Sequence, residues 1–124
     1  MIQQKFSFKQ RLRSFTYALN GLKVVIREEH NARIHLVAAA IVICLGFFFG
    51  ISRFEWIAVA LCIGAVLAAE IFNTAIEDIA DFISPGKHEK IKRIKDLAAA
   101  AVLVCAAASV TVGLIIFLPR LMNW

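Results

Sequence analysis

The feature that most constrains this chain is a long apolar segment whose second half carries acidic side chains. The apolar run begins at Phe54, and its continuation includes Glu70, Asn73, Glu77 and Asp81. At about 100° per residue, these four polar residues fall within about 80° of one another and form one stripe on a helix. A charge at membrane depth costs roughly 2.5–3.5 kcal/mol on insertion scales. Three acids cannot neutralise one another, so the stripe predicts bound cations, for which a divalent metal with a phosphorylated ligand is the natural proposal.

A purely structural interpretation of the same stripe stays open at this point. The acids can pair with Lys or Arg side chains of other helices, or can lie as solvated charges at the level of the lipid headgroups. Asp78 lies off the stripe and is interpreted as a solvated charge.

Composition places the chain among membrane proteins. Of its 124 residues 60% are apolar, and the mean hydropathy is +0.76. That is too apolar for a soluble protein of this length, and the length fits a single domain covering residues 1–124. The net charge of +5 indicates an anionic membrane surface or a phosphorylated ligand. The three cysteines show no C-x-x-C spacing and are interpreted as small apolar residues.

Hydrophobic periodicity predicts an all-α membrane protein with four helical segments. An amphipathic surface helix is expected at about residues 7–27, because large apolar residues recur there at spacings of three and four among basic ones. Capping boxes are predicted at Ser7 with Gln10 and at Ser52 with Glu55. Three transmembrane helices are expected at about residues 34–51, 54–83 and 97–118, the last ending at Pro119.

The distribution of cations predicts the topology. Residues 1–33 hold seven Lys and Arg and residues 84–96 hold five, whereas the 52–55 turn holds one. The positive-inside rule therefore puts the N-terminus and the 84–96 loop in the cytoplasm. The polar stripe, Glu29 and Lys95 would then meet at the cytoplasmic end of the helices. Three spans cannot bury polar faces on every helix, so a homo-oligomer with sites shared between subunits is expected.

Two polar residues near the first span have local interpretations. Glu29 and Arg33 are four residues apart and predict an intrahelical ion pair. His35 is interpreted as an interfacial histidine rather than as a ligand. Glu29 itself is placed near the depth at which the acidic stripe should emerge.

The predicted cluster contains what phosphoryl transfer requires. That reaction needs a metal to bridge phosphates, cations to spread their charge, and a base to take the proton of the acceptor. Glu29 and the acids of the stripe can supply the metal site and the base, and Lys95 with the cations of residues 87–93 can supply positive charge. The sequence has neither a Walker A loop nor a kinase-type glycine-rich loop.

One sequence motif resembles that of a known protein family. It consists of the run Ala69-Glu70-Ile71-Phe72-Asn73-Thr74-Ala75-Ile76-Glu77, followed by Lys95-Asp96 at the start of an alanine-rich segment. In motif, length and order of spans, the chain resembles the small prokaryotic diacylglycerol kinase family, which includes the undecaprenol kinases. The resemblance implies a homotrimer in the bacterial inner membrane. It also implies transfer of the γ-phosphate of Mg-ATP to the hydroxyl of a membrane lipid, either undecaprenol or diacylglycerol.

The resemblance also assigns roles to residues. It implies that Glu70 is the general base and that Glu29 and Glu77 bind the metal ion. Gln10 stands where a basic residue is expected, and Arg11 or Arg13 is the candidate to replace it. The resemblance further implies an ATP-binding set that contains the two metal-binding acids and Tyr17, Gly86, Lys87, His88, Lys95 and Asp96. It implies supporting roles for Asn73, Asp81 and Arg13.

A second class of function fits part of the pattern. A small oligomeric proton-coupled membrane transporter can use a buried acid such as Glu70 as a proton relay. Such a transporter needs only one acid near the middle of the membrane. It would give no reason for the polar cluster of Asn73, Glu77, Lys95 and Asp96.

Overall fold

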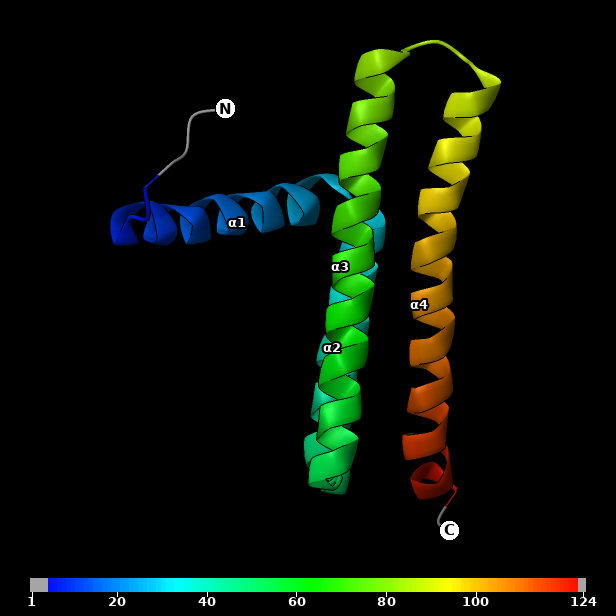
Figure 1. Cartoon of the computed structure of the whole chain (residues 1–124). Helices are drawn as coiled ribbons and strands as arrows, with labels where there is room; N and C mark the ends of the chain where they lie inside the picture. The colour runs from blue at the N-terminus through cyan, green and yellow to red at the C-terminus, as the bar shows by residue number, and fades with distance from the viewer. Residues whose placement is uncertain (1–4, 123–124) are drawn as a thin grey trace.

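The computed structural model describes residues 5–122, which form four α-helices joined by short turns. They are α1 (Phe8–Glu28), α2 (His30–Phe49), α3 (Arg53–Ile83) and α4 (Glu89–Leu121). The last three run alongside one another, and α1 lies across them as a separate arm (Figure 1). Each of α2, α3 and α4 is long and apolar enough to cross a bilayer. The prediction of an all-α chain with three helices long and apolar enough to cross a membrane is confirmed.

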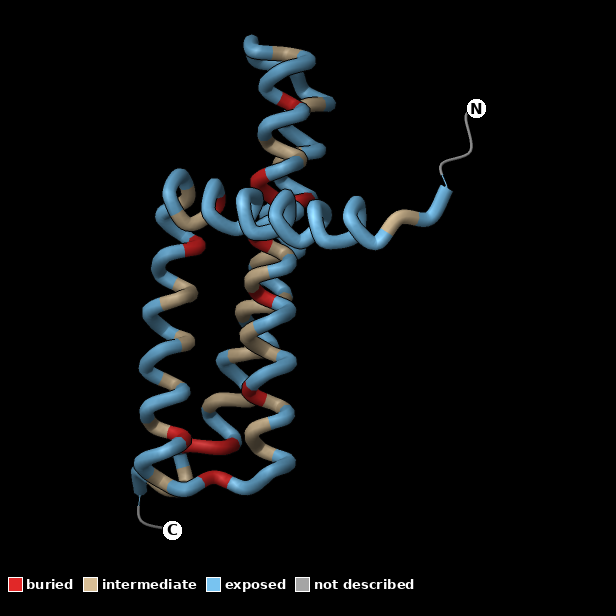
Figure 2. The backbone as a smooth tube through the Cα atoms, turned by 90° about the vertical axis from the view of Figure 1, so that its left-hand side faces the viewer, coloured by how far each residue is buried: buried red, intermediate tan, exposed pale blue. Residues whose placement is uncertain are grey.

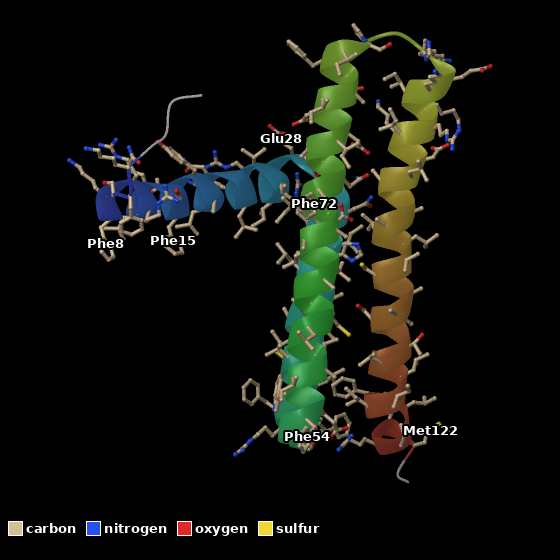
Figure 3. The ribbon with its side chains drawn as sticks, in the orientation of Figure 1. Phe8, Phe15, Glu28, Phe54, Phe72 and Met122 are labelled. Atoms are coloured by element: carbon tan, nitrogen blue, oxygen red, sulfur yellow. The ribbon has the colours of Figure 1, made fainter. Side chains whose placement is uncertain are left out.

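Helix α1 has the two-faced character expected from its sequence. The Ser7 side chain accepts a hydrogen bond from the backbone N–H of Gln10 at 3.4 Å, which is one half of the predicted capping box. Phe8 and Phe15 point to the same side of α1, toward the end of the bundle where α2 turns into α3 (Figure 3). An apolar face directed along the length of the bundle suits a helix lying on a membrane surface, which stays a prediction.

The turn between α2 and α3 is closed by local hydrogen bonds. Gly50 adopts the left-handed conformation with φ of 61° and ends α2, a conformation that glycine adopts without a Cβ clash. The predicted capping box is confirmed at the next helix: Glu55 N–H donates to the Ser52 hydroxyl at 3.2 Å, and Ser52 N–H donates to the Glu55 carboxylate at 2.9 Å.

A small apolar core lies at this end of the bundle. Ile51, Val59, Ile116 and Phe117 are buried there, and Trp56 packs against them. Because Gly46 has no side chain, the Trp56 ring can pack directly against α2 at this position. A Cβ atom at position 46 would lie 2.6 Å from the Trp56 ring and 3.2 Å from Ile51.

Gly46→Ala is therefore expected to destabilise the protein by about 1–3 kcal/mol, the usual effect of overpacking a core. Thermal unfolding in detergent should show a lower Tm for this variant. Gly21→Ala is the matched control, because a Cβ at Gly21 has nothing within 4 Å. A Gly46→Ala protein as stable as Gly21→Ala would show that Trp56 moves aside freely.

Helix α4 is longer than its predicted apolar span. The segment treated as an 84–96 loop is helical from Glu89, where His88 Nδ1 accepts a hydrogen bond from Lys90 N–H at 3.1 Å. At the other end α4 continues through Pro119 to Leu121. Arg120 donates to both Glu55 carboxylate oxygens at 2.7 and 2.8 Å and so joins the two helices at that end. The hydrophobic pattern missed these extensions because they depend on capping and on a tertiary ion pair.

A single chain leaves most of its apolar surface uncovered. Large apolar side chains such as Phe54, Phe72 and Leu103 are 69–82% exposed, and buried segments are sparse along the backbone (Figure 2). Helix α3 packs along α4, whereas α2 and α4 touch little. Apolar faces of this kind suit contact with lipid chains.

Candidate active site at the junction of α1, α2 and α3

Buried polar residues gather where α1 crosses the bundle. Figure 2 shows buried segments of the tube at this crossing, and Phe72 of α3 lies close to the end of α1 in Figure 3. Within residues 5–122 the buried polar side chains all belong to α3: Glu70 is 1% exposed, Asn73 7% and Thr74 4%. Ala32 of α2 is fully buried as well. Its small side chain permits a close approach of α2.

Burial decreases along the predicted stripe of α3. Glu70 and Asn73 are buried, Glu77 is half-buried and Asp81 is exposed. The stripe therefore leads from a deep acid to a shallow one. Phe72, next to Asn73 in sequence, lies level with the end of α1, and α3 continues beyond it to the α3–α4 turn (Figure 3).

Glu70 is a buried carboxylate that lacks hydrogen-bond donors. Neither of its oxygens has a hydrogen-bond partner among the described residues. His35 of α2 brings Nε2 to 3.2 Å from Oε1 of Glu70, close enough for an ion pair although the ring is not aligned for a hydrogen bond. Leaving a buried carboxylate this poorly partnered is costly, which is typical of a functional position. The interfacial interpretation of His35 missed this contact.

The next turn of α3 orients the second acid. Asn73 Nδ2 donates to Glu77 Oε1 at 3.3 Å, while Asn73 Oδ1 and the Thr74 hydroxyl are buried without a partner. Thr74 is not one of the residues of the predicted stripe. Its spacing of four residues from Glu70 places it on the same face of α3 and could have indicated it.

Glu29 lies between α1 and α2, where it faces the acids of α3. Partial burial raises the pKa of the Glu29 carboxyl, and the charges of Glu77 and Glu70 raise it further. Three carboxylates thus concentrate negative charge at one junction. A cation bound there would relieve the repulsion.

The predicted ion pair between Glu29 and Arg33 is absent from the salt bridges of the described residues. Arg33 donates instead to the backbone carbonyls of Ile26 and Arg27, at 2.9 and 2.5 Å. These carbonyls lie in the last turn of α1 and lack helical partners. The bend between α1 and α2 brings them within reach of the guanidinium group, so Arg33 caps α1 and leaves Glu29 without its expected partner.

The raised pKa of Glu29 predicts a pH-dependent stability. When the pH is below 4.5, the usual pKa of a Glu carboxyl, Glu29 is protonated in both the folded and the unfolded protein, and its carboxyl is not repelled by the other acids. As the pH rises through the raised folded value, ionisation destabilises the folded protein. In metal-free buffer Glu29→Gln should therefore have a higher Tm than the native protein at neutral pH and the same Tm below about pH 4.

Glu28→Gln is the matched control for this measurement, because Glu28 is an exposed neighbour of Glu29. Thermal unfolding of both variants across the pH range separates a local effect from a change in net charge. Equal shifts in Tm for the two variants would contradict the repulsion between Glu29 and the acids of α3.

Two of the residues predicted to bind nucleotide, Lys95 and Asp96, are paired within the chain. Lys95 donates to Asp81 in a short charged contact, and Lys92 donates to Asp96 at 2.6 Å. Gly86, Lys87 and His88 form the α3–α4 turn, which begins about 20 Å beyond Glu70 along α3 at roughly 1.5 Å per residue. One chain therefore does not bring the turn to the buried acid.

Two predicted site residues lie on α1. Arg13 and Tyr17 are exposed, more than two helical turns before the junction. Nothing in the described chain contacts them in a way that forms a site, so they could join the acids only through another subunit or a ligand.

The donor set at the junction fits one kind of metal site. The described residues hold no group of three or more His, Cys, Asp or Glu that could bind a metal ion alone. Magnesium in phosphoryl-transfer enzymes is usually held by one or two carboxylates together with substrate phosphates. Glu29 and Glu77, which repel each other through the charges described above, fit such a shared site.

Comparisons with known proteins identify the family of the chain. The model of the prokaryotic diacylglycerol kinase family matches residues 16–117. Undecaprenol kinase of Bacillus subtilis is 41% identical over 109 residues, covering 88% of this chain and 89% of that protein. Diacylglycerol kinases of Synechocystis (34% over 111 residues, 89% and 63% covered) and Haemophilus influenzae (33% over 108 residues, 86% and 92% covered) are also similar. The chain belongs to the prokaryotic diacylglycerol kinase family.

Proposed function

We propose that this lipid kinase transfers the γ-phosphate of ATP to the hydroxyl of a membrane lipid, with Mg²⁺ as cofactor. The observation that carries the proposal is Glu70, a carboxylate that is 1% exposed and has no hydrogen-bond donor on either oxygen. A buried acceptor of this kind can take a proton from a substrate hydroxyl. The proton-relay alternative uses only this acid and leaves Asn73 and Glu77 unexplained.

The residues of the junction have different roles, which depend on how deeply each one is buried. Glu70, the deeper acid, accepts the proton of the lipid hydroxyl as its oxygen attacks the phosphate. Glu29 and Glu77, nearer the end of the bundle, would hold the metal ion, and Asn73 fixes Glu77 by donating to it at 3.3 Å. The metal ion would supply positive charge that offsets the negative charge of the ATP phosphates. Lys95 and the α3–α4 turn are the candidate nucleotide contacts, with Asp96, Arg13 and Tyr17.

The acceptor is a long-chain lipid alcohol, and undecaprenol is favoured over diacylglycerol. The higher identity to the undecaprenol kinase, 41% against 34% and 33% for the diacylglycerol kinases, supports this choice. Purified protein in mixed micelles should give a higher kcat/KM with undecaprenol than with diacylglycerol under the same conditions. A higher value with diacylglycerol would reverse the assignment of the lipid and leave the kinase activity intact.

We also propose a homotrimer whose sites draw residues from more than one subunit. The uncovered apolar faces and the separation of the α3–α4 turn from Glu70 support it. Mixing inactive Glu29→Gln subunits with inactive Glu70→Gln subunits should restore part of the activity, because some sites would then contain both native acids. No recovery in verified mixed oligomers would place each site within one chain.

The membrane placement completes the proposal. Three apolar helices in a bacterial kinase family support a bacterial membrane protein. The seven cations of residues 1–33 favour a cytoplasmic N-terminus in the inner membrane. The acidic junction then faces the compartment that contains ATP. Protease protection of an N-terminal tag in inverted and right-side-out vesicles would test this orientation.

A further inference from the structure

We infer that Arg33 is a positioning residue for Glu29: its guanidinium group closes the bend between α1 and α2 and so keeps the Glu29 carboxylate opposite Glu77. This inference rests on the proposed role of Glu29 and Glu77 in holding the metal ion. It gives a side chain that caps α1 a further task in the binding of metal and nucleotide.

The first argument is the contact that Arg33 makes across the bend. Its Nε donates to the carbonyl of Ile26 at 2.9 Å, and its Nη2 donates to the carbonyl of Arg27 at 2.5 Å. Within residues 5–122 these are the side-chain hydrogen bonds that join α1 to another helix. A guanidinium group presents its donors in a rigid planar fork, so it holds both carbonyls at once. The last turn of α1 is therefore fixed relative to the first turn of α2.

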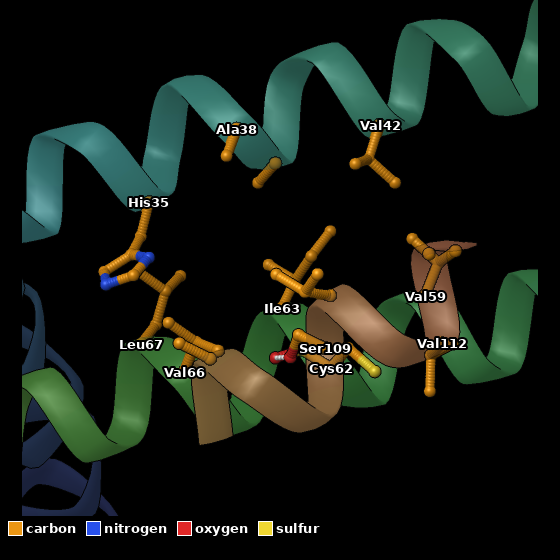
Figure 4. A pocket seen from close by; sticks show the side chains of 14 residues that line it. His35, Ala38, Val42, Val59, Cys62, Ile63, Val66, Leu67, Ser109 and Val112 are labelled. Atoms are coloured by element: carbon orange, nitrogen blue, oxygen red, sulfur yellow. Dashed lines mark hydrogen bonds between the residues drawn. The ribbon is translucent and has the colours of Figure 1, made fainter. Parts of the chain in front are cut away.

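The second argument is that α2 is packed against the bundle at the same level. Ala32, which precedes Arg33, is fully buried. His35 lines a cavity of about 240 Å³ between α2, α3 and α4, and Leu67 of α3 lies beside its ring (Figure 4). The ring also brings Nε2 to 3.2 Å from Oε1 of Glu70. Arg33 thus connects α1 to a part of α2 that is already in contact with α3.

The third argument is the position of Glu29. It is the residue between the two helices, with an extended backbone (φ −107°, ψ 116°), and its side chain does not cap α2. The carboxylate is half-buried, and the charges of Glu77 and Glu70 act on it. Because Glu29 belongs to the bend, a change in the bend would move its carboxylate relative to the acids of α3. Metal ligands depend on neighbouring groups for their orientation in just this way.

Arg33 has two effects on cation binding, and they have opposite signs. Its positive charge repels a cation, so removing the charge alone would strengthen metal binding. Its hold on the bend places Glu29 beside Glu77, so losing the hold would weaken metal binding. The second effect should dominate, because the side chain is exposed and its charge is therefore screened by solvent and salt.

The test measures the binding of Mn²⁺ together with a non-hydrolysable ATP analogue, by equilibrium dialysis against the purified full-length oligomer. Arg33→Gln keeps a polar side chain and removes the fork, so the affinity should fall by about 10–100-fold, the usual effect of losing a group that orients a metal ligand. Arg33→Lys keeps the charge without the planar fork and should lose at least about threefold in affinity.

The kinase assay supplies a second readout. The Mg²⁺ concentration for half-maximal activity of Arg33→Gln should rise by about the same 10–100-fold. At saturating Mg²⁺ its kcat should stay within about threefold of native, because positioning of a metal ligand acts on binding. The oligomeric state and Tm of each variant are measured as well. A fall in kcat at an unchanged Mg²⁺ requirement would make the role of Arg33 purely structural and overturn the inference.

A double-variant cycle separates positioning from a direct contact of Arg33 with the nucleotide phosphates. If Arg33 acts through Glu29, Arg33→Gln should lower the affinity no further in a Glu29→Gln background. Additive losses would overturn the inference, as would a native or higher affinity for Arg33→Gln. Arg27→Gln is the matched control, because Arg27 is an exposed arginine at the same bend. Its affinity should be native, and a fall equal to that of Arg33→Gln would also count against the inference.

Glu29→Gln on its own distinguishes failure of this inference from failure of the proposed function. If Glu29→Gln binds Mn²⁺ and the analogue as the native protein does, the metal assignment itself is wrong. If Glu29→Gln is weakened while Arg33→Gln is native, only the role of Arg33 is rejected.

Discussion

Glu70→Gln is expected to lower kcat by about 10²–10⁴-fold, the usual contribution of a general base, and to leave the KM for Mg-ATP nearly unchanged. The amide has almost the same shape as the carboxylate but cannot accept the hydroxyl proton. Because Glu70 is 1% exposed, its replacement acts at the deep end of the junction, seven residues before Glu77 on α3. Steady-state kinetics in micelles measure both constants.

The principal control for this variant is structural. Removing a buried charge can also stabilise the fold, so the oligomeric state and Tm of Glu70→Gln must be measured with its kinetics. Glu28→Gln tests for any effect of losing a carboxylate as such, since Glu28 is exposed. A Glu70→Gln protein with nearly native kcat, or one that loses activity only in proportion to lost oligomer, would refute the base assignment.

Glu77→Gln is expected to weaken the metal site instead. Its carboxylate is half-buried and is oriented by Asn73, and it contributes to the negative charge that raises the pKa of Glu29. Loss of groups that support a metal ligand commonly lowers affinity by about 10–100-fold, and loss of a ligand itself should do at least as much. The KM for Mg-ATP should rise by that factor, and part of the activity should return at higher Mg²⁺.

Asp78→Asn is the control for this second variant. Asp78 neighbours Glu77 in sequence but is exposed, so its change should affect the magnesium dependence little. Titration of activity with Mg²⁺ at fixed ATP measures the difference. The metal assignment fails if Glu77→Gln and the native enzyme need the same Mg²⁺ concentration.

Features set by local spacing were predictable from the sequence. The three apolar helices follow from long uninterrupted hydrophobic runs, and the capping box of Ser52 and Glu55 follows from residues three positions apart. The helical period also placed Glu70, Asn73 and Glu77 on one face of α3. Their graded burial, from Glu70 to Glu77, is a finding of the structure.

Features that depend on the packing of distant segments were not predictable in this way. The contact of His35 with Glu70 joins residues of α2 and α3. The ion pair of Arg120 with Glu55 joins the last turn of α4 to the first turn of α3. Arg33 was assigned to Glu29 by spacing but binds the end of α1, because the bend between the helices presents unpaired carbonyls to it. Spacing along one helix contains no information on such tertiary alternatives.

The most direct test of the central claim is the fate of the ATP phosphates. Purified oligomer would be incubated in micelles with Mg²⁺, undecaprenol or diacylglycerol, and ATP labelled at either the γ- or the α-phosphate, and the lipids would then be extracted. We expect label in the lipid phosphate only from γ-labelled ATP, and almost none with Glu70→Gln. Absence of labelled lipid with both alcohols while the oligomer is intact, or equal labelling by Glu70→Gln, would contradict the account.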